Sequence, residues 1–147
     1  MPISIAIAKD LVRAICRHYP VLATSIAYKI REQQTEAIHE STTIKSAGIV
    51  RGAYFPRRRF VAIATANIRD ENHFTRVVKH EALGHFGINT FTATDKRKLL
   101  DAILKTKSAP EFATLWLKVD ALYQNTDEDY KAEEIFAFAC EEINHKI

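Results

Sequence analysis

The sequence predicts an α+β fold, in which a small antiparallel sheet or hairpin packs against several helices. Apolar residues recur at helical spacing towards both ends of the chain, whereas the middle holds short runs rich in β-branched and aromatic residues. The 147 residues suit one domain, and we expect a single domain over residues 1–147. A hydrophobic content of 47%, with four glycines and four prolines, indicates a globular chain and excludes a disordered one.

The N-terminal part, residues 1–40, is expected to be helical. Apolar residues recur at helical spacing until Pro20 interrupts the pattern: Leu11, Val12, Ile15 and Cys16. A second helix is predicted over residues 21–38, because Leu22, Ile26 and Ile30 are spaced four apart. The alternation of Ile3, Ile5 and Ile7 also permits a short strand at the start of the chain.

Residues 47–66 are expected to form a β-hairpin. Two runs of β-forming residues, 49–54 and 60–65, flank a five-residue loop at 55–59. Pro56 falls in that loop, where it removes no hydrogen bond from either strand. The basic cluster Arg57, Arg58 and Arg59 lies beside it, and we expect these side chains to be solvated at the hairpin tip.

The rest of the chain is predicted to be helical. The helix at 70–87 has Asp70 as its N-cap and Gly87 as the glycine that ends it. In the C-terminal part, residues 94–145, Thr94 is expected to cap one helix and the capping box at 108–111 to open another. A last helix is predicted over residues 127–144.

The segment His80-Glu81-Ala82-Leu83-Gly84-His85 carries the strongest chemical signal. Its histidines are five residues apart, and on a regular α-helix that step rotates the second side chain by about 140° away from the first. Two imidazoles placed so cannot share a metal ion. The segment is therefore either no metal site or a helix with a one-residue π-turn, which would return His85 to the face of His80. Gly84 lies within the interval and tolerates such a distortion.

A metal site with two histidines needs a third protein ligand, which is usually a carboxylate. The candidates are Glu133 and Glu134, about fifty residues downstream on the last predicted helix. Helical geometry favours Glu133 slightly, because it lies closer to the apolar stripe. We choose Glu134, because the small Ala137 lets the two helices approach, and keep Glu133 as the substitute. Glu133, Asp129 and Asp127 are also available as hydrogen-bond partners of the ligands.

These two motifs carry a resemblance. HEALGH resembles the HELLGH motif of the dipeptidyl-peptidase III family of zinc peptidases, and Glu133-Glu134-Ile135-Phe136-Ala137 resembles the start of that family's EECRAE motif. Phe136 and Phe138 replace the arginine and the final glutamate. From about Tyr54 to Ala139, the chain is more similar to the small zincin-like metallopeptidase domains in polyvalent proteins of phages and conjugative elements.

The resemblance implies a zincin-like fold with Zn²⁺ held by His80, His85 and Glu134. It implies that Glu81 is the general base of a zinc metallopeptidase, which activates a zinc-bound water to hydrolyse a peptide or protein substrate. One further side chain would donate a hydrogen bond in the transition state, and the sequence does not rank the candidates: Tyr54, His73, Tyr123, Tyr130 and His145.

Two alternatives stay open. The first is a catalytically inactive zincin-fold domain that binds zinc or a protein. The second is a nucleic-acid-binding accessory protein of a mobile element that uses Arg57, Arg58, Arg59 and Arg69. Because the net charge is only +3, nucleic acid is not expected as a partner if the chain is a zinc metallopeptidase. With no apolar run near about 20 residues, no signal-like N-terminus and two cysteines, we expect a cytoplasmic protein with no membrane contact.

Overall fold

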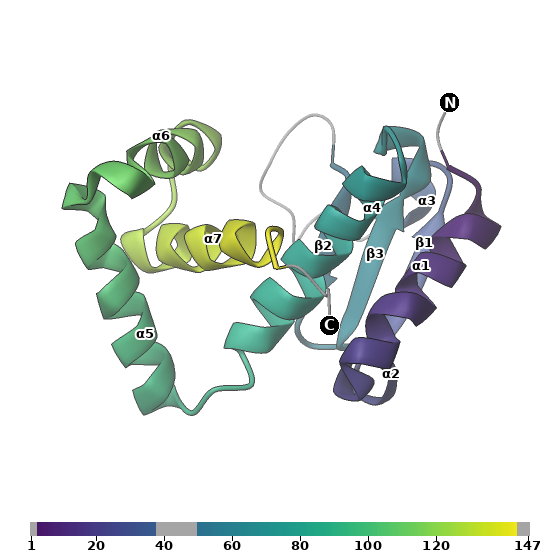
Figure 1. Ribbon diagram of the computed structural model, residues 1–147, viewed down its shortest axis with the longest axis horizontal. Helices are drawn as coiled ribbons and strands as arrows, with labels where there is room; N and C mark the ends of the chain where they lie inside the picture. The colour runs from purple at the N-terminus through teal and green to yellow at the C-terminus, as the bar shows by residue number, and fades with distance from the viewer. Residues whose placement is uncertain (1–2, 38–49, 144–147) are drawn as a thin grey trace.

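The computed structural model describes residues 3–37 and 50–143. It combines helices with a three-stranded sheet, which confirms the predicted α+β class (Figure 1). The sheet and helices α1 to α4 form one part of the molecule, and helices α5 to α7 form the other. The long helix that begins as α4 runs from the sheet towards α5, and α7 lies against it.

The predicted hairpin is present in the described residues. Strand β2 (Gly52–Phe55) pairs antiparallel with β3 (Phe60–Ala64), and residues 56–59 connect them. Phe55, expected in the loop, pairs with Phe60 and stacks on its ring at a centroid distance of 4.5 Å. Residues 47–49 of the predicted hairpin lie outside the described part of the chain.

The prediction of a helix over residues 21–38 is wrong. Helix α2 (Pro20–Ser25) ends early, and β1 (Ala27–Arg31) follows and pairs in parallel with β3. The spacing of Ile26 and Ile30 fits both structures, because four residues are one helical turn and also two strand repeats. The sheet has the order β1-β3-β2 and is mixed, so the expected purely antiparallel sheet is corrected as well.

Helices α1 (Ile5–His18) and α4 (Glu71–Val78) pack on one face of the sheet. Ser4 caps α1, so the alternative of a strand over residues 3–7 is wrong. The core on this face joins apolar residues from both helices and from the strands: Ala8, Val12, Ile15, Ile30, Val61, Ile63, Phe74 and Val78. On the other face, the small residues Ala62 and Ala64 of β3 contact Ala37 of the short helix α3 (Gln34–Ala37).

Helix α4 continues without a break into the π-helix η3 (Lys79–Phe86). The side chain of Asp70 accepts a hydrogen bond from the backbone N–H of His73, which confirms the predicted N-cap. Gly87 does not end the helix as predicted, because its φ of −56° is right-handed and the helix runs to Ile88. The 3-10 turn η2 (Thr65–Asn67) connects β3 to the loop before α4.

The C-terminal helices enclose a second core. Helix α5 (Ala93–Lys105) is capped by Thr92 and not by Thr94. The predicted capping box is wrong: two 3-10 turns, η4 (Thr106–Ser108) and η5 (Pro110–Phe112), lead into α6 (Ala113–Leu122) without a side-chain cap.

The last helix, α7 (Glu128–Cys140), is capped by Asp127. The core holds Ile88, Leu100, Trp116, Val119, Ala132 and Ile135. The prediction extends the last helix to residue 144, which lies outside the described ranges, whereas α7 ends at Cys140.

Within residues 3–37 and 50–143, no helix has the length and apolar character that crossing a bilayer requires. Each of the two cores contributes one element to the contact between the halves of the molecule. The first core contains Ala82 and Phe86 of η3, and the second contains Ala132 and Ile135 of α7. The side chains between η3 and α7 therefore lie where the two cores meet.

Candidate metal centre and adjoining pocket

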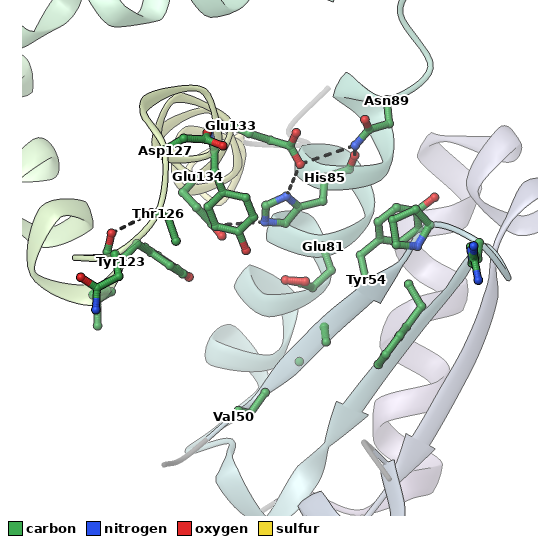
Figure 2. A pocket seen from close by; sticks show the side chains of 18 of the residues that line it. Val50, Tyr54, Glu81, His85, Asn89, Tyr123, Thr126, Asp127, Glu133 and Glu134 are labelled. Carbon is green, nitrogen blue, oxygen red and sulfur yellow. Dashed lines mark hydrogen bonds and ion pairs between the residues drawn. The ribbon is translucent and has the colours of Figure 1, made fainter. Parts of the chain in front are cut away.

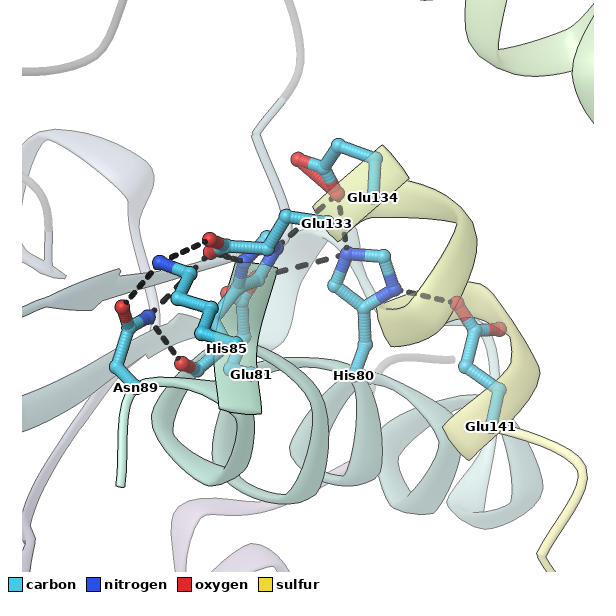
Figure 3. Close-up of polar contacts among 8 residues, drawn as sticks. His80, Glu81, His85, Asn89, Glu133, Glu134 and Glu141 are labelled. Carbon is cyan, nitrogen blue, oxygen red and sulfur yellow. Dashed lines mark hydrogen bonds and ion pairs between the residues drawn. The ribbon is translucent and has the colours of Figure 1, made fainter. Parts of the chain in front are cut away.

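The π-turn that the histidine spacing requires is present. Residues Lys79–Phe86 form a π-helix, and the rings of His80 and His85 lie 5.1 Å apart, measured between their centroids. The extra residue in the turn therefore returns both imidazoles to one side of the helix, the side that faces α7 (Figure 3). The prediction of a distorted helix at this motif is confirmed.

A close backbone contact explains why α7 can come so near. A Cβ placed on Gly84 would lie 2.6 Å from both the Cα and the Cβ of Ala137. Only a glycine facing a small residue allows two helices to approach to this distance. On the other side of the same continuous helix, a Cβ placed on Gly52 of strand β2 would lie 2.7 Å from Cγ1 of Val77, near the end of α4. The helix is thus fixed between β2 and α7.

Glu134 lies between the two histidines. Its Oε1 atom is 3.0 Å from Nε2 of His80 and 3.0 Å from Nε2 of His85. All three residues are buried, and Glu134 is only 2% exposed. The two nitrogens that face the interior of the site therefore converge on one carboxylate oxygen. Glu133, the substitute candidate, contacts the outer side of His85 instead.

The outer nitrogen of each ring has its own carboxylate. Nδ1 of His80 lies 2.8 Å from Oε2 of Glu141, and Nδ1 of His85 lies 2.7 Å from Oε2 of Glu133 (Figure 3). Such partners fix the orientation and tautomer of metal-binding histidines. Of the other partners named from the sequence, Asp127 caps α7 and Asp129 pairs with Arg97 of α5.

Sequence reasoning missed three members of this network. Glu141 follows Glu134 by seven residues, which is two helical turns, so its place on the same face of α7 could have been inferred. Lys96 of α5 lies 3.2 Å from Oε1 of Glu133, and its ammonium group also donates to the side chain of Asn89 over 2.7 Å. Asn89 follows His85 by four residues, about one helical turn, so its place beside His85 could also have been inferred. Nothing in the sequence connects Lys96 to this site, because the packing of α5 on α7 brings it there.

Glu81 is buried beside this group and keeps one oxygen without a partner. Its Oε2 atom has no hydrogen bond, and its Oε1 atom is 3.9 Å from Nε2 of His80. Burial raises the pKa of this carboxyl. A buried carboxylate oxygen without a hydrogen bond is costly unless another group satisfies it. A cation would supply that partner.

The histidines and carboxylates of the cluster stabilise each other's charged forms. Burial alone would lower the pKa of His80, but its hydrogen bonds to Glu134 and Glu141 outweigh burial and raise the pKa to about 9. Burial would also lower the pKa of His85, but contacts with Glu133 and Glu134 raise it to about 11. Against the effect of burial, both histidines lower the pKa of Glu134 to about 2.

The donor set fits a metal ion. His80, Glu81 and His85 offer ligand atoms that all lie within 4.8 Å of one another, and they form a group that could hold a metal. The oxygen of Glu134 lies next to both imidazoles of that group. Two imidazoles with a carboxylate are a common ligand set for transition metals.

A pocket of about 1150 Å³ opens over the cluster (Figure 2). Glu81, His85 and Glu134 line it together with the β2–β3 turn and the loop between α6 and α7. Three of the five side chains named as possible donors line the pocket: Tyr54, Tyr123 and Tyr130. His73 lies elsewhere, at the start of α4, where its Nδ1 accepts a hydrogen bond from the backbone of Arg69. His145 lies outside the described residues.

The arginines named from the sequence do not form one patch. Arg57 and Arg58 are exposed on the β2–β3 turn and line the pocket. Arg59 completes that turn with a φ of 52°, a left-handed conformation that is uncommon outside glycine. Arg69 follows the opposite end of β3, before α4. The sheet therefore separates Arg69 from the other three.

Comparison with known proteins gives one informative match. Over 152 aligned residues, the chain is 34% identical to DNA primase TraC of Escherichia coli. The match covers 97% of this chain but only 10% of the relative, so the chain spans about a tenth of that protein's length. No family model matches the chain, and no solved structure matches it.

This comparison contradicts the main functional assignment made from the sequence. The relative is named a DNA primase, so the assignment as a zinc metallopeptidase, and with it a hydrolase acting on a peptide or protein substrate, is wrong. The expectation that nucleic acid is not a partner is corrected by the same finding. The chain is similar to a segment of a protein whose printed name connects it with DNA.

Proposed function

We propose that this chain is a nucleic-acid-binding accessory domain that carries a zinc ion. The similarity to DNA primase TraC over 97% of the chain is the observation that supports it. Of the assignments that the sequence left open, the nucleic-acid-binding accessory protein of a mobile element agrees best with that similarity. The domain accompanies other parts of a longer protein in the relative, whose length is about ten times the matched segment.

In this proposal, zinc is held by His80, His85 and Glu134, and Glu81 lies beside it. The ligand types suit zinc, for which two histidines and one glutamate are a known set of protein ligands. The bound ion would supply a cross-link between η3 and α7. Glu133 and Glu141 hold the outer ring nitrogens and so orient both histidines. The zincin-like arrangement of the two motifs is part of the same proposal.

Nucleic acid is bound at the β2–β3 turn. Arg57 and Arg58 are both exposed there, beside the pocket. Guanidinium groups pair well with phosphates because their planar donors match two oxygens. Arg59 is left out of the tests below, because its backbone is left-handed and a substitution there could change the stability of the turn as well as its charge.

The test is binding of fluorescently labelled single-stranded DNA, followed by anisotropy at several salt concentrations. We expect affinity to fall with salt, and the double variant Arg57→Ala/Arg58→Ala to reduce the slope of log K against log salt by about 1.4, or about 0.7 per phosphate contact. The matched control is Lys98→Ala/Lys105→Ala, which removes two charges from the exposed side of α5. An equal loss in both variants, or no binding by the unaltered chain, would overturn the proposal.

A further inference from the structure

We propose that the pocket over the metal centre binds unpaired bases of a single-stranded nucleic acid, stacked on its tyrosines. The inference rests on the proposed function and gives it a ligand class and a place. Two kinds of group that line the pocket each suit one part of such a ligand: aromatic rings and arginines.

The tyrosines supply surfaces for bases. Tyr123 directly follows α6, and Tyr130 lies in the first turn of α7. Their ring centroids are 5.6 Å apart, and the ring planes meet at an angle of 62°. Tyr130 is 44% exposed although it borders the site. Tyr54 lies on the β2 side of the pocket, where it meets Phe86 edge-on at 5.9 Å (Figure 2). Stacking on such rings accepts any base, because every base has a flat face.

The arginines supply contacts for phosphates. Arg57 and Arg58 line the pocket from the β2–β3 turn, which is a different wall from that of Tyr123 and Tyr130. A strand whose bases enter the pocket would thus keep its backbone near positive charge. A duplex cannot use the pocket in this way, because its bases are stacked on each other and present only their edges.

The carboxylates of the pocket are balanced by the histidines beside them. Glu81, Glu133 and Glu134 line the pocket, and negative charge alone would repel a phosphate backbone. All four ring nitrogens of His80 and His85 lie against carboxylate oxygens, so the metal-free cluster holds positive charge as well. A divalent cation that takes the place of two protons leaves the charge of the cluster unchanged.

The first experiment measures binding of a labelled thymidine oligonucleotide of about 12 nucleotides, at constant salt, by anisotropy. Tyr130→Ala is expected to weaken binding by about tenfold, the loss that one base–aromatic stack produces, and Tyr130→Phe to restore most of it. The matched control is Phe91→Ala. Phe91 is also 44% exposed but is not among the residues that line the pocket.

The second experiment compares the single strand with a duplex of the same length, each bound by the unaltered protein at the same salt concentration. We expect weaker binding of the duplex, because its stacked bases cannot reach the tyrosines.

Two results would overturn the inference while leaving the proposed function in place. These are equal binding by Tyr130→Ala and the unaltered protein, and equal affinity for single strand and duplex. If the unaltered protein binds no nucleic acid at all, the proposed function and this inference both fail.

Discussion

Gly84 of η3 and Ala137 of α7 are in backbone contact. A methyl group on Gly84 would meet Ala137 at 2.6 Å, far inside the distance at which two carbon atoms pack. This contact brings Glu134, one helical turn before Ala137, to both imidazoles of the π-helix. The approach of the two helices and the geometry of the metal centre are therefore one structural feature.

The substitution Gly84→Ala is expected to destabilise the protein and to weaken the metal centre. Because the obstructing atoms include the Cα of Ala137, the helices must separate to accommodate the new methyl group. We expect a loss of about 2 kcal/mol in the free energy of unfolding, as for other overpacked cores, measured by urea denaturation.

Gly87→Ala is the matched control for this substitution. A Cβ at Gly87 would have the carbonyl oxygen of Ala82 as its nearest contact, at 4.0 Å, and the backbone of Gly87 is helical. Alanine at a helical position is favoured over glycine, so stability should rise by about 0.5–1 kcal/mol. Equal effects at the two glycines would show that helix propensity, and not the contact with Ala137, decides the outcome.

Glu134→Gln should impair metal binding more than Glu133→Gln. Glu134 faces the inner nitrogens of both histidines, whereas Glu133 contacts only the outer nitrogen of His85. Loss of an outer partner lowers metal affinity by about 10- to 100-fold, and loss of a ligand lowers it further. Competition with a chromophoric chelator measures both affinities, and the reverse order would make Glu133 the ligand.

Lys96→Met is expected to lower metal affinity although Lys96 contacts Glu133 and none of the proposed ligands His80, His85 and Glu134. Its ammonium group lies 3.2 Å from Glu133 and bonds Asn89, so it holds Glu133 against His85. We expect a decrease of about tenfold. The control is Lys98→Met on the exposed side of the same helix. If both variants bind metal as well as the unaltered protein, Lys96 has no positioning role.

The metal-free protein should be most stable at mildly acidic pH. The folded-state pKa of His80 is raised from 6.5 to about 9, so its stabilising contribution is complete below about 6.5 and is lost as pH rises through 9. The pKa of Glu134 is lowered from 4.5 to about 2, so its contribution is lost as pH falls below 4.5. Urea denaturation of chelator-treated protein at pH 5.5, 7.5 and 9.5 should therefore show falling stability. A flat profile, or a rising one, would contradict the charged histidine–carboxylate network.

Local sequence signals predicted much of what forms the site. The five-residue spacing of His80 and His85 required a π-turn, and Asp70 and Asp127 mark the starts of the two helices that meet there. These signals are local, because a cap or a turn is decided within a few residues. The small side chain of Ala137 also indicated that the two helices approach each other closely.

The parts that could not be predicted depend on contacts distant in sequence. Strand β1 was taken as helix because the spacing of Ile26 and Ile30 fits both periods, and only pairing with β3 decides between them. Lys96 reaches Glu133 through the packing of α5 on α7. The two motifs also did not predict the function correctly. The pattern of histidines and glutamates predicted a peptidase, and the similarity to a DNA primase contradicts that prediction.

Elemental analysis of protein purified without added metal tests the central claim most directly. We predict one zinc ion per chain in the unaltered protein, and loss of that zinc in His85→Ala while Phe91→Ala retains it. Protein that contains no metal and takes none up from solution, or a His85→Ala variant that still holds one zinc, would contradict a metal centre built by the π-helix and α7.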